Sequence, residues 1–142
     1  MSYSLAFSKA ILVVLFVADK VKQGMFDFVP TKAISQALDI PAPTAVKILQ
    51  SLNRAGIIET REGARGGVRL AKPLTQINVL DILNAIEQER PLFRTDLKIN
   101  VTGEKPTRSQ RAVLGVLQDA ENKMKASLKS VTLAELIAKI NQ

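Results

Sequence analysis

Two short helical segments on either side of a proline-containing break limit the fold of this chain more than any other feature. Thr31 can cap a first helix over residues 32–38, whose apolar side chains share one face. Pro41 and Pro43 then interrupt the chain, and Pro43 suits the first turn of a second helix because its missing N–H needs no partner there. The second helix is expected to end just before Gly56. Two short helices joined by a tight turn are typical of a helix-turn-helix.

The second helix separates an apolar face from a polar and partly basic one. At helical spacing, its core face carries Ala45, Ile48, Leu49 and Leu52. A candidate DNA-binding face is made by this helix and the preceding one, and consists of Lys32, Pro43, Thr44, Lys47, Gln50, Ser51 and Arg54. We expect Thr44, Lys47 and Gln50 to reach base edges in the major groove, while the flanking basic residues neutralise phosphates. An ordinary solvated helix face is the alternative, and the basic hairpin that follows disfavours it.

A glycine-rich hairpin is expected directly after this helix. Residues 57–60 and 68–71 have the pattern of paired strands, and the seven residues between them include three glycines. Residues 41–76 hold six Lys or Arg against two Glu, so more than half of the net charge of +7 lies in a quarter of the chain. We interpret the hairpin as a wing that contacts phosphates or the minor groove through Arg61, Arg65, Gly66, Gly67 and Arg69. A solvated hairpin whose glycines serve only the turn is the alternative.

Residues 1–89 are interpreted as one winged helix-turn-helix domain. An apolar segment over residues 5–23 predicts a helix that is hydrophobic on almost every side and therefore buried between other elements. Asn78 and Asp81 have the spacing of a capping box at the start of a further helix. Residues 90–107 lack periodicity and contain glycine and proline, which indicates a linker.

Residues 108–142 are expected to form a helical dimerisation region. A long helix over residues 109–128 carries a narrow apolar strip of the coiled-coil type. The strip consists of Val113, Val116, Leu117, Ala120 and Met124. We expect it to pair with the same helix of a second chain in a homodimer, with packing against its own domain as the alternative. Thr132 and Glu135 have capping-box spacing for a last helix, so the fold class is mainly α with a small β-hairpin wing and a long C-terminal dimerisation helix.

The complete absence of cysteine and histidine excludes several classes of site. Disulfides, thiolate or imidazole metal sites, and Ser-His or Cys-His catalysis are all ruled out. Because no other catalytic constellation is recognisable, an enzyme is not expected. The apolar run over residues 10–18 is about half the length that crosses a bilayer and lacks the flanks of a signal peptide, which predicts a cytoplasmic protein without membrane contact.

The wing and the elements after it resemble those of the Rrf2 family of bacterial winged-helix regulators. The resemblance rests on residues 66–71 (Gly-Gly-Val-Arg-Leu-Ala), on the isoleucine-rich helix that ends at Glu87, and on residues 132–136 (Thr-Leu-Ala-Glu-Leu). It covers essentially the whole chain and implies a winged-helix DNA-binding domain with a long dimerisation helix. Iron–sulfur members of the family place cysteines in the segment corresponding to residues 90–107, whereas this chain has none, so no cofactor or metal is expected.

The resemblance also bears on which DNA is read. Iron–sulfur members read bases with Ser and Glu-Gln at positions that correspond here to Pro43, Val46 and Lys47, so a different operator is expected.

Together these features predict a sequence-specific DNA-binding transcriptional regulator whose partners are double-stranded DNA and a second copy of the chain. Two-fold symmetry of a dimer implies a pseudo-palindromic operator, and repression by occlusion needs no contact with polymerase. The alternative from another class is a winged-helix protein-interaction module that does not bind DNA. A basic run is either solvated or lines a pocket for an unknown acidic small-molecule effector, and it comprises Arg94, Lys98, Lys105, Arg108 and Arg111.

Overall fold

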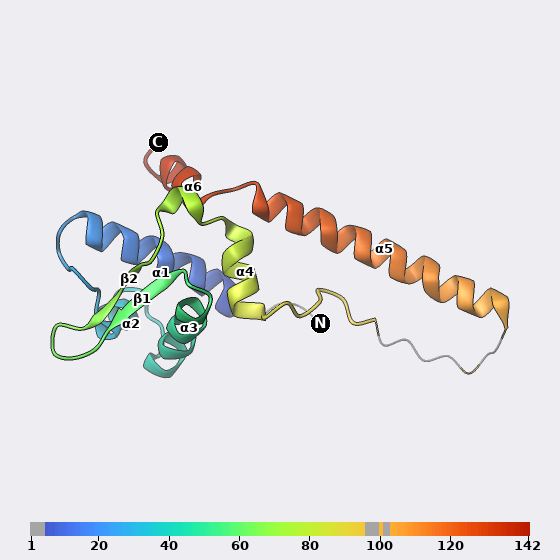
Figure 1. The fold of residues 1–142 in the computed structure, drawn as a ribbon, viewed down its shortest axis with the longest axis horizontal. Coiled ribbons are helices and arrows are strands. Elements are labelled where there is room, and N and C mark those ends of the chain that lie inside the picture. Colours follow the sequence, from blue (N-terminus) through green and yellow to red (C-terminus); the bar gives the residue numbers. More distant parts are fainter. Residues whose placement is uncertain (1–4, 96–99, 101–102) are drawn as a thin grey trace.

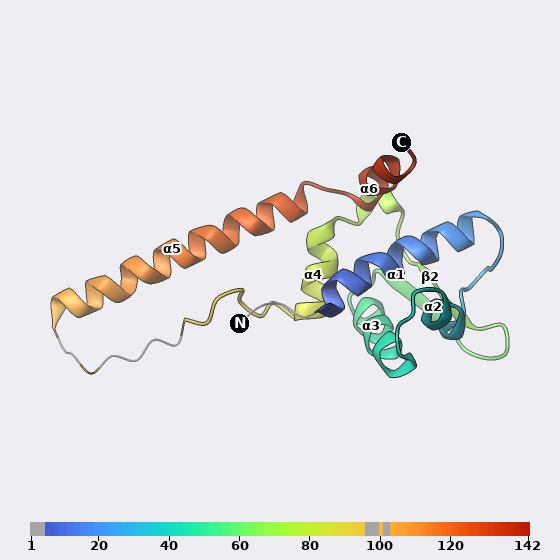
Figure 2. The ribbon, with the colours of Figure 1, turned by 180° about the vertical axis from the view of Figure 1, so that it is seen from behind.

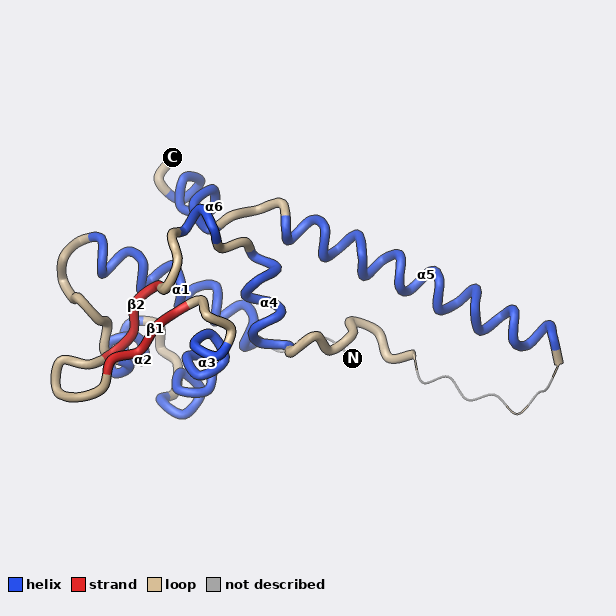
Figure 3. Tube along the Cα trace, viewed as in Figure 1, coloured by secondary structure: helices blue, strands red, loops and turns tan. Residues whose placement is uncertain are grey.

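The computed structural model describes residues 5–95, 100 and 103–142 of the 142-residue chain. Its elements follow in the order α1 (Leu5–Lys22), α2 (Thr31–Ala37), α3 (Ala42–Arg54), β1 (Ile58–Arg61), β2 (Gly67–Leu70), η1 (Leu74–Gln76), α4 (Val79–Glu87), α5 (Glu104–Lys129) and α6 (Leu133–Ile140). Figure 1 shows a globular body from which α5 projects as a long arm, and Figure 2 shows the same separation from behind. Helices dominate, with one two-stranded antiparallel hairpin (Figure 3). This architecture confirms the predicted fold class.

α1 packs one of its faces against α3, α4 and β2. Its fully buried stripe consists of Ala10, Val13, Val14 and Val17. The opposite side is uncovered, since Leu5 is 68% exposed and Leu12 is 54% exposed. The prediction that this helix is buried on almost every side was therefore wrong, because a single chain supplies neighbours for only one of its faces.

α2 and α3 form the helix-turn-helix. The carbonyl of Pro30 accepts a hydrogen bond from the backbone N–H of Ala33 (3.0 Å), so α2 begins one residue earlier than expected. Pro30, rather than Thr31, is the N-cap, which corrects the predicted cap. Pro43 lies in the first turn of α3, as the sequence predicted, where the missing N–H costs no helical hydrogen bond.

β1 and β2 pair as the predicted hairpin, although β1 starts one residue later and β2 one residue earlier than expected. In the observed register Arg61 lies opposite Gly67. A further extended residue, Val29 in the connection between α1 and α2, pairs with Val68 through two backbone hydrogen bonds (2.7 and 2.9 Å). The wing is therefore attached to the body by backbone pairing as well as by side-chain packing.

α4 begins at the predicted capping box. The backbone N–H of Asn78 donates to Asp81 Oδ2 (3.0 Å), and Asn78 Oδ1 accepts from the backbone N–H of Asp81 (2.9 Å). Both orphan donors at the start of the helix are thus satisfied within the motif.

α6 returns the C-terminal segment to the body. Thr132 caps it through Oγ1, which accepts from the backbone N–H of Glu135 (3.1 Å). Leu133 is fully buried, and its backbone N–H donates to the carbonyl of Ile77 (2.8 Å). The C-terminal end of the arm that α5 forms is therefore anchored to the domain.

α5 begins at Glu104, five residues before the expected start. Pro106 is its third residue, a position where the backbone N–H has no helical partner, so proline does not interrupt the helix. Residues 104–107 therefore belong to this helix rather than to the expected linker. No side chain of α5 is buried, and Val113 and Val116 are 46% and 69% exposed.

Gly67 provides a test of the wing's attachment, because a Cβ at this position would lie 2.3 Å from the carbonyl oxygen of Val29. Backbone cannot give way as a flexible side chain does, so we expect Gly67→Ala to lower the free energy of unfolding by about 1–3 kcal/mol, measured by denaturant titration. Gly63→Ala is the control: it also has positive φ (99°), but its Cβ would meet nothing within 4 Å. Equal losses in the two variants would show that the close approach to Val29 does not matter.

Candidate nucleic-acid interface

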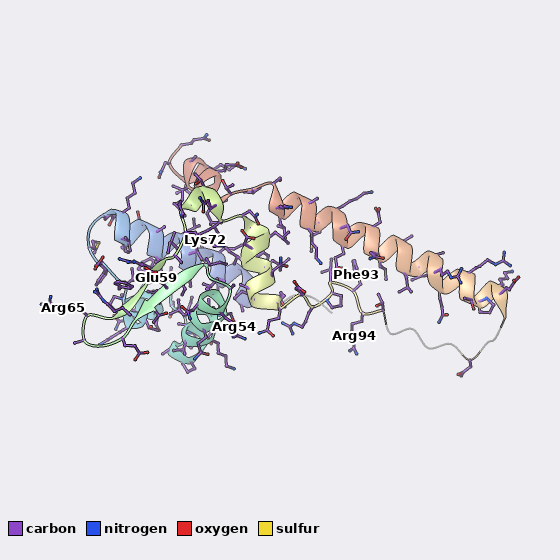
Figure 4. All side chains as sticks on the ribbon, viewed as in Figure 1. Arg54, Glu59, Arg65, Lys72, Phe93 and Arg94 are labelled. Atoms are coloured by element: carbon purple, nitrogen blue, oxygen red, sulfur yellow. The ribbon has the colours of Figure 1, made fainter. Side chains whose placement is uncertain are left out.

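α3 packs its apolar residues into the body and leaves a polar face in solvent. Ala45, Ile48, Leu49 and Leu52 are at most 6% exposed, so packing sets the orientation of the helix. The exposed residues of the predicted face are Pro43, Lys47, Gln50 and Arg54, and the half-buried ones are Thr44 and Ser51. Figure 4 shows Arg54 at the C-terminal end of α3. Lys32 is exposed in the first turn of α2, which packs against α3.

Two further residues of α3 are exposed that sequence reasoning did not assign to the site. Val46 is 41% exposed, and Asn53 is also exposed. The Thr60 hydroxyl of β1 donates to Asn53 Oδ1 (3.3 Å), which connects the wing to the end of the helix. Both residues share the helical spacing of Gln50, at i−4 and i+3, so the signal that could have found them was present in the sequence.

The three wing arginines have different surroundings. Arg61 pairs with Asp27 (Nη1–Oδ2 3.4 Å), and Arg69 pairs with Asp27 (Nη1–Oδ1 3.4 Å) and with Glu59 (Nε–Oε1 2.5 Å). The hydrogen bond that Arg69 donates to the Glu59 carboxylate raises the pKa of Arg69 above its ordinary value, with the Asp27 carboxylate adding to the effect. Within the part of the chain that the structure describes, the side chain of Arg65 makes no hydrogen bond or ion pair.

Phe28 lies beneath both paired arginines. The guanidinium carbons of Arg61 and Arg69 are 4.2 and 4.4 Å from the centroid of its ring, and only 9% of Phe28 is exposed. Such distances are typical of cation–π contacts. Neither Asp27 nor Phe28 was found from the sequence, because they precede α2 and are more than 30 residues from the wing.

Positive charge is distributed over the candidate face differently from what the sequence of residues 41–76 suggested. Around the wing, three arginines are balanced by Asp27, Glu59 and Glu62, so the formal charges cancel. The unbalanced positive groups of the candidate face are those on α2 and α3, namely Lys32, Lys47 and Arg54. The window over residues 41–76 looked strongly basic because it counted Lys47, Arg54 and Lys72 together with the wing and left out Asp27.

Close backbone packing explains why glycine occupies positions 66 and 67, the two glycines assigned to the wing contact. A Cβ on Gly66 would lie 2.2 Å from the carbonyl oxygen of Arg61, and one on Gly67 would meet Val29. Both positions therefore require glycine for the hairpin to close, whatever the wing contacts. Their contact with DNA stays a prediction.

Two hollows lie on the arm, and Arg108 and Arg111 of the expected effector segment line one of them. One, of about 350 Å³, is lined by Gly103, Glu104, Thr107, Arg108 and Arg111. The other, of about 290 Å³, lies between α5 and the chain leaving α4, and it is lined by Pro91, Phe93, Thr95, Leu114, Leu117, Gln118 and Glu121. Phe93 and Arg94 are labelled in Figure 4. Arg108 and Arg111 are brought together, Arg94 and Lys105 line neither hollow, and Lys98 lies outside the described residues.

No group of three or more potential ligands is placed to hold a metal ion within residues 5–95, 100 and 103–142. Iron–sulfur clusters are held by thiolates, with histidine replacing some of them in one class. The chain contains neither residue, so its donor set does not fit such a cluster. In the same described ranges, no helix has the length and apolarity needed to cross a membrane.

Comparison with known proteins gives consistent results at the levels of sequence and fold. In sequence, the chain is 33% identical over 105 residues to slr0846 of Synechocystis sp., a protein named as an HTH-type transcriptional regulator, with 74% of this chain and 68% of that protein aligned. It is 34% identical over 62 residues to the HTH-type transcriptional regulator IscR of Cereibacter sphaeroides, covering 44% of this chain and 40% of that one.

Solved structures show the same fold. IscR of T. potens superposes with a TM-score of 0.70 at 20% identity, covering 99% of this chain and 88% of that one. CymR, the global cysteine regulator of B. subtilis, superposes with a TM-score of 0.67 at 19% identity over 98% of each chain. A family model described as "Rrf2: Iron-dependent Transcriptional regulator" matches residues 3–139. The chain therefore belongs to the Rrf2 family of transcriptional regulators and is not an enzyme.

Proposed function

We propose that this protein is a cytoplasmic, sequence-specific DNA-binding repressor that acts as a homodimer on a pseudo-palindromic operator. The observation that carries the proposal is the exposed polar face of α3, which is opposite a completely buried apolar face. The packing that buries the apolar face leaves the polar one available to a major groove. A protein-interaction module would instead need an apolar or acidic face here, whereas Lys47 and Arg54 make this one basic.

Different parts of the face have different roles in this proposal. Lys47 and Gln50 read base edges because they are exposed on the side of α3 directed away from the core, and the half-buried Thr44 does so from the border of that face. Val46 offers an apolar contact to a thymine methyl group. Lys32 and Arg54 neutralise phosphates and so set the register of the protein on the duplex.

The surface of α5 supports dimerisation through the predicted strip. Packing of this strip against its own domain would bury it, yet Val113 and Val116 are exposed and no residue of α5 is buried. An apolar strip on an extended helix is stabilised when a second copy covers it. Two copies related by two-fold symmetry would present two α3 helices, which is why the operator is pseudo-palindromic.

Control of this repressor must come from something other than an iron–sulfur cluster. The chain has no thiolate or imidazole to hold one, and carboxylates suit hard cations rather than sulfide-bridged iron. A small acidic effector at the hollow lined by Arg108 and Arg111 is the candidate, because that hollow lies at the start of the helix proposed to dimerise.

Selection of duplexes from a random pool tests DNA binding, operator symmetry and sequence together. We expect a selected duplex with inverted half-sites, and affinity that falls steeply with salt, by about a thousandfold between 50 and 200 mM for about six phosphate contacts per dimer. Lys47→Ala should relax the preference at one base position per half-site, since a good base contact is worth about 1–3 kcal/mol.

The matched control for this substitution is Lys139→Ala, which removes the same charge from an exposed position on α6. It should leave the selected sequence unchanged. If no duplex is selected, the protein-interaction alternative replaces the proposal.

Dimerisation is tested by placing a carboxylate in the strip. Val116→Glu would put an unpaired charge in the seam, which costs several kcal/mol, so the variant should sediment as a monomer and bind the selected duplex far more weakly. Asn122→Glu adds the same charge on the opposite side of α5 and should stay dimeric. A Val116→Glu variant that remains dimeric would move the seam elsewhere, with the exposed side of α1 around Leu12 as the next candidate.

Absence of a redox cofactor is tested by spectroscopy. Protein purified without oxygen should show no visible absorption band, and its DNA affinity should not respond to nitric oxide, peroxide or thiol reagents, because no sulfur ligand is present. A band from bound iron and sulfide would contradict this. Effector binding is assayed separately by thermal melting with candidate acids, since a ligand at 100 times its Kd adds about 2.7 kcal/mol of stability.

A further inference from the structure

We propose that Asp27 and Phe28 are positioning residues that hold two of the wing arginines, Arg61 and Arg69, and thereby aim the wing, while Arg65 alone makes the wing's phosphate contact. This inference deepens the proposed function and rests on it for its DNA-binding part. We call Asp27 and Phe28 the wing seat. The seat belongs to the connection between α1 and α2, which is remote in sequence from the hairpin but adjacent to it in the fold.

The wing seat holds both strands of the hairpin at once. One carboxylate oxygen of Asp27 faces Arg61 on β1, and the other faces Arg69 on β2, each at 3.4 Å. The largely buried ring of Phe28 lies about 4 Å from both guanidinium groups (4.2 and 4.4 Å). Because one carboxylate and one ring engage both strands, a movement of the hairpin relative to the body would break several contacts together.

Backbone contacts beside the wing seat also hold the hairpin in place relative to the body. Val29, the next residue after Phe28, pairs with Val68 of β2 through two hydrogen bonds. Within the wing, Arg61 Nη2 donates to the carbonyl of Arg65 (3.0 Å), so a seated arginine also holds the loop at the hairpin tip. The chain of contacts therefore runs from the body, through Asp27, to the backbone that carries Arg65.

Arg65 differs from its two neighbours in charge balance and in position. The guanidinium groups of Arg61 and Arg69 already face carboxylates, so a phosphate would have to compete with Asp27 and Glu59 for them. Arg65 is exposed, and Figure 4 shows it extending from the end of the hairpin. A phosphate can be neutralised by Arg65 without breaking any ion pair, which makes it the favoured contact.

Trypsin cleavage after Arg65 tests the seat without DNA. Asp27→Asn removes one charge and both ion pairs, and Asp27 is exposed, so the fold should survive. We expect cleavage in the wing to become about 3- to 10-fold faster, since exposed pairs contribute modestly and cleavage follows local opening. Asp19→Asn, which removes the same charge and an ion pair with Lys20, is the control and should be cleaved at the wild-type rate. Equal rates of trypsin cleavage in the wild-type protein, Asp27→Asn and Asp19→Asn would show that Asp27 does not hold the wing.

Whether Asp27 orients the wing for DNA is tested by measuring affinity for two duplexes of the same length. One is the duplex selected by the wild-type protein, and the other has a scrambled sequence. Asp27→Asn should lower the ratio of the two affinities by about 3- to 10-fold, although its added positive charge favours any DNA. Asp19→Asn should keep the wild-type ratio. A ratio that stays constant or rises in Asp27→Asn would show that Asp27 competes with DNA rather than positioning the wing, and would overturn the proposal.

The salt dependence of DNA binding tests whether Arg65, rather than Arg61, makes the phosphate contact. Arg65→Ala should reduce the slope of log affinity against log salt by about 0.9 for each protomer, the value for one lost phosphate contact. Arg61→Ala removes the same charge and should leave the slope unchanged while accelerating trypsin cleavage after Arg65. Equal slope losses in the two variants would overturn the division. If the wild-type protein selects no duplex, the proposed function fails, whereas the trypsin result still decides the seat.

Discussion

The wing depends on a backbone contact between two segments that are far apart in the chain. Val29 and Val68 exchange two hydrogen bonds, and this pairing requires a residue without a side chain at Gly67. A two-stranded hairpin alone is marginally stable in water, so the third extended segment gives this one a fixed position. The same contact brings Asp27 and Phe28 beneath the hairpin, and the surroundings of the wing arginines follow from it.

The pairing of Val29 with Val68 also affects the charge of the wing, because it brings Asp27 close to the wing arginines. A wing that looks basic in sequence becomes electrically balanced once Asp27 and Glu59 are placed beside Arg61 and Arg69. Within the described part of the candidate face, Lys32, Lys47, Arg54 and Arg65 have no such carboxylate partner. In the proposed function, electrostatic attraction to DNA comes mainly from the helices and from Arg65, while Arg61 and Arg69 hold the hairpin in position.

The arm formed by α5 is part of the fold that this chain shares with solved structures such as IscR of T. potens. Its length and its exposed apolar residues suit an assembly of two copies, the arrangement that two-fold DNA recognition needs. The segment before it has no sulfur ligand, and the two hollows on the arm are lined by charged, polar and apolar side chains, among them Arg108 and Arg111. In the proposed function, a small acidic effector at the hollow lined by Arg108 and Arg111 provides the signal.

Local features were determined by the sequence itself, because their causes lie within a few residues. The proline in the first turn of α3, the Asn78–Asp81 capping box and the separated faces of α3 all agree with the structure. Two helix boundaries differ from the predicted ones because of neighbouring backbone groups. Pro30, rather than Thr31, is the N-cap of α2, and α5 begins early enough to include Pro106. Only the tertiary structure decided that one side of α1 stays exposed and that Asp27 and Phe28 meet the wing. Those outcomes depend on which distant segments become neighbours, and hydrophobic periodicity carries no information about that pairing.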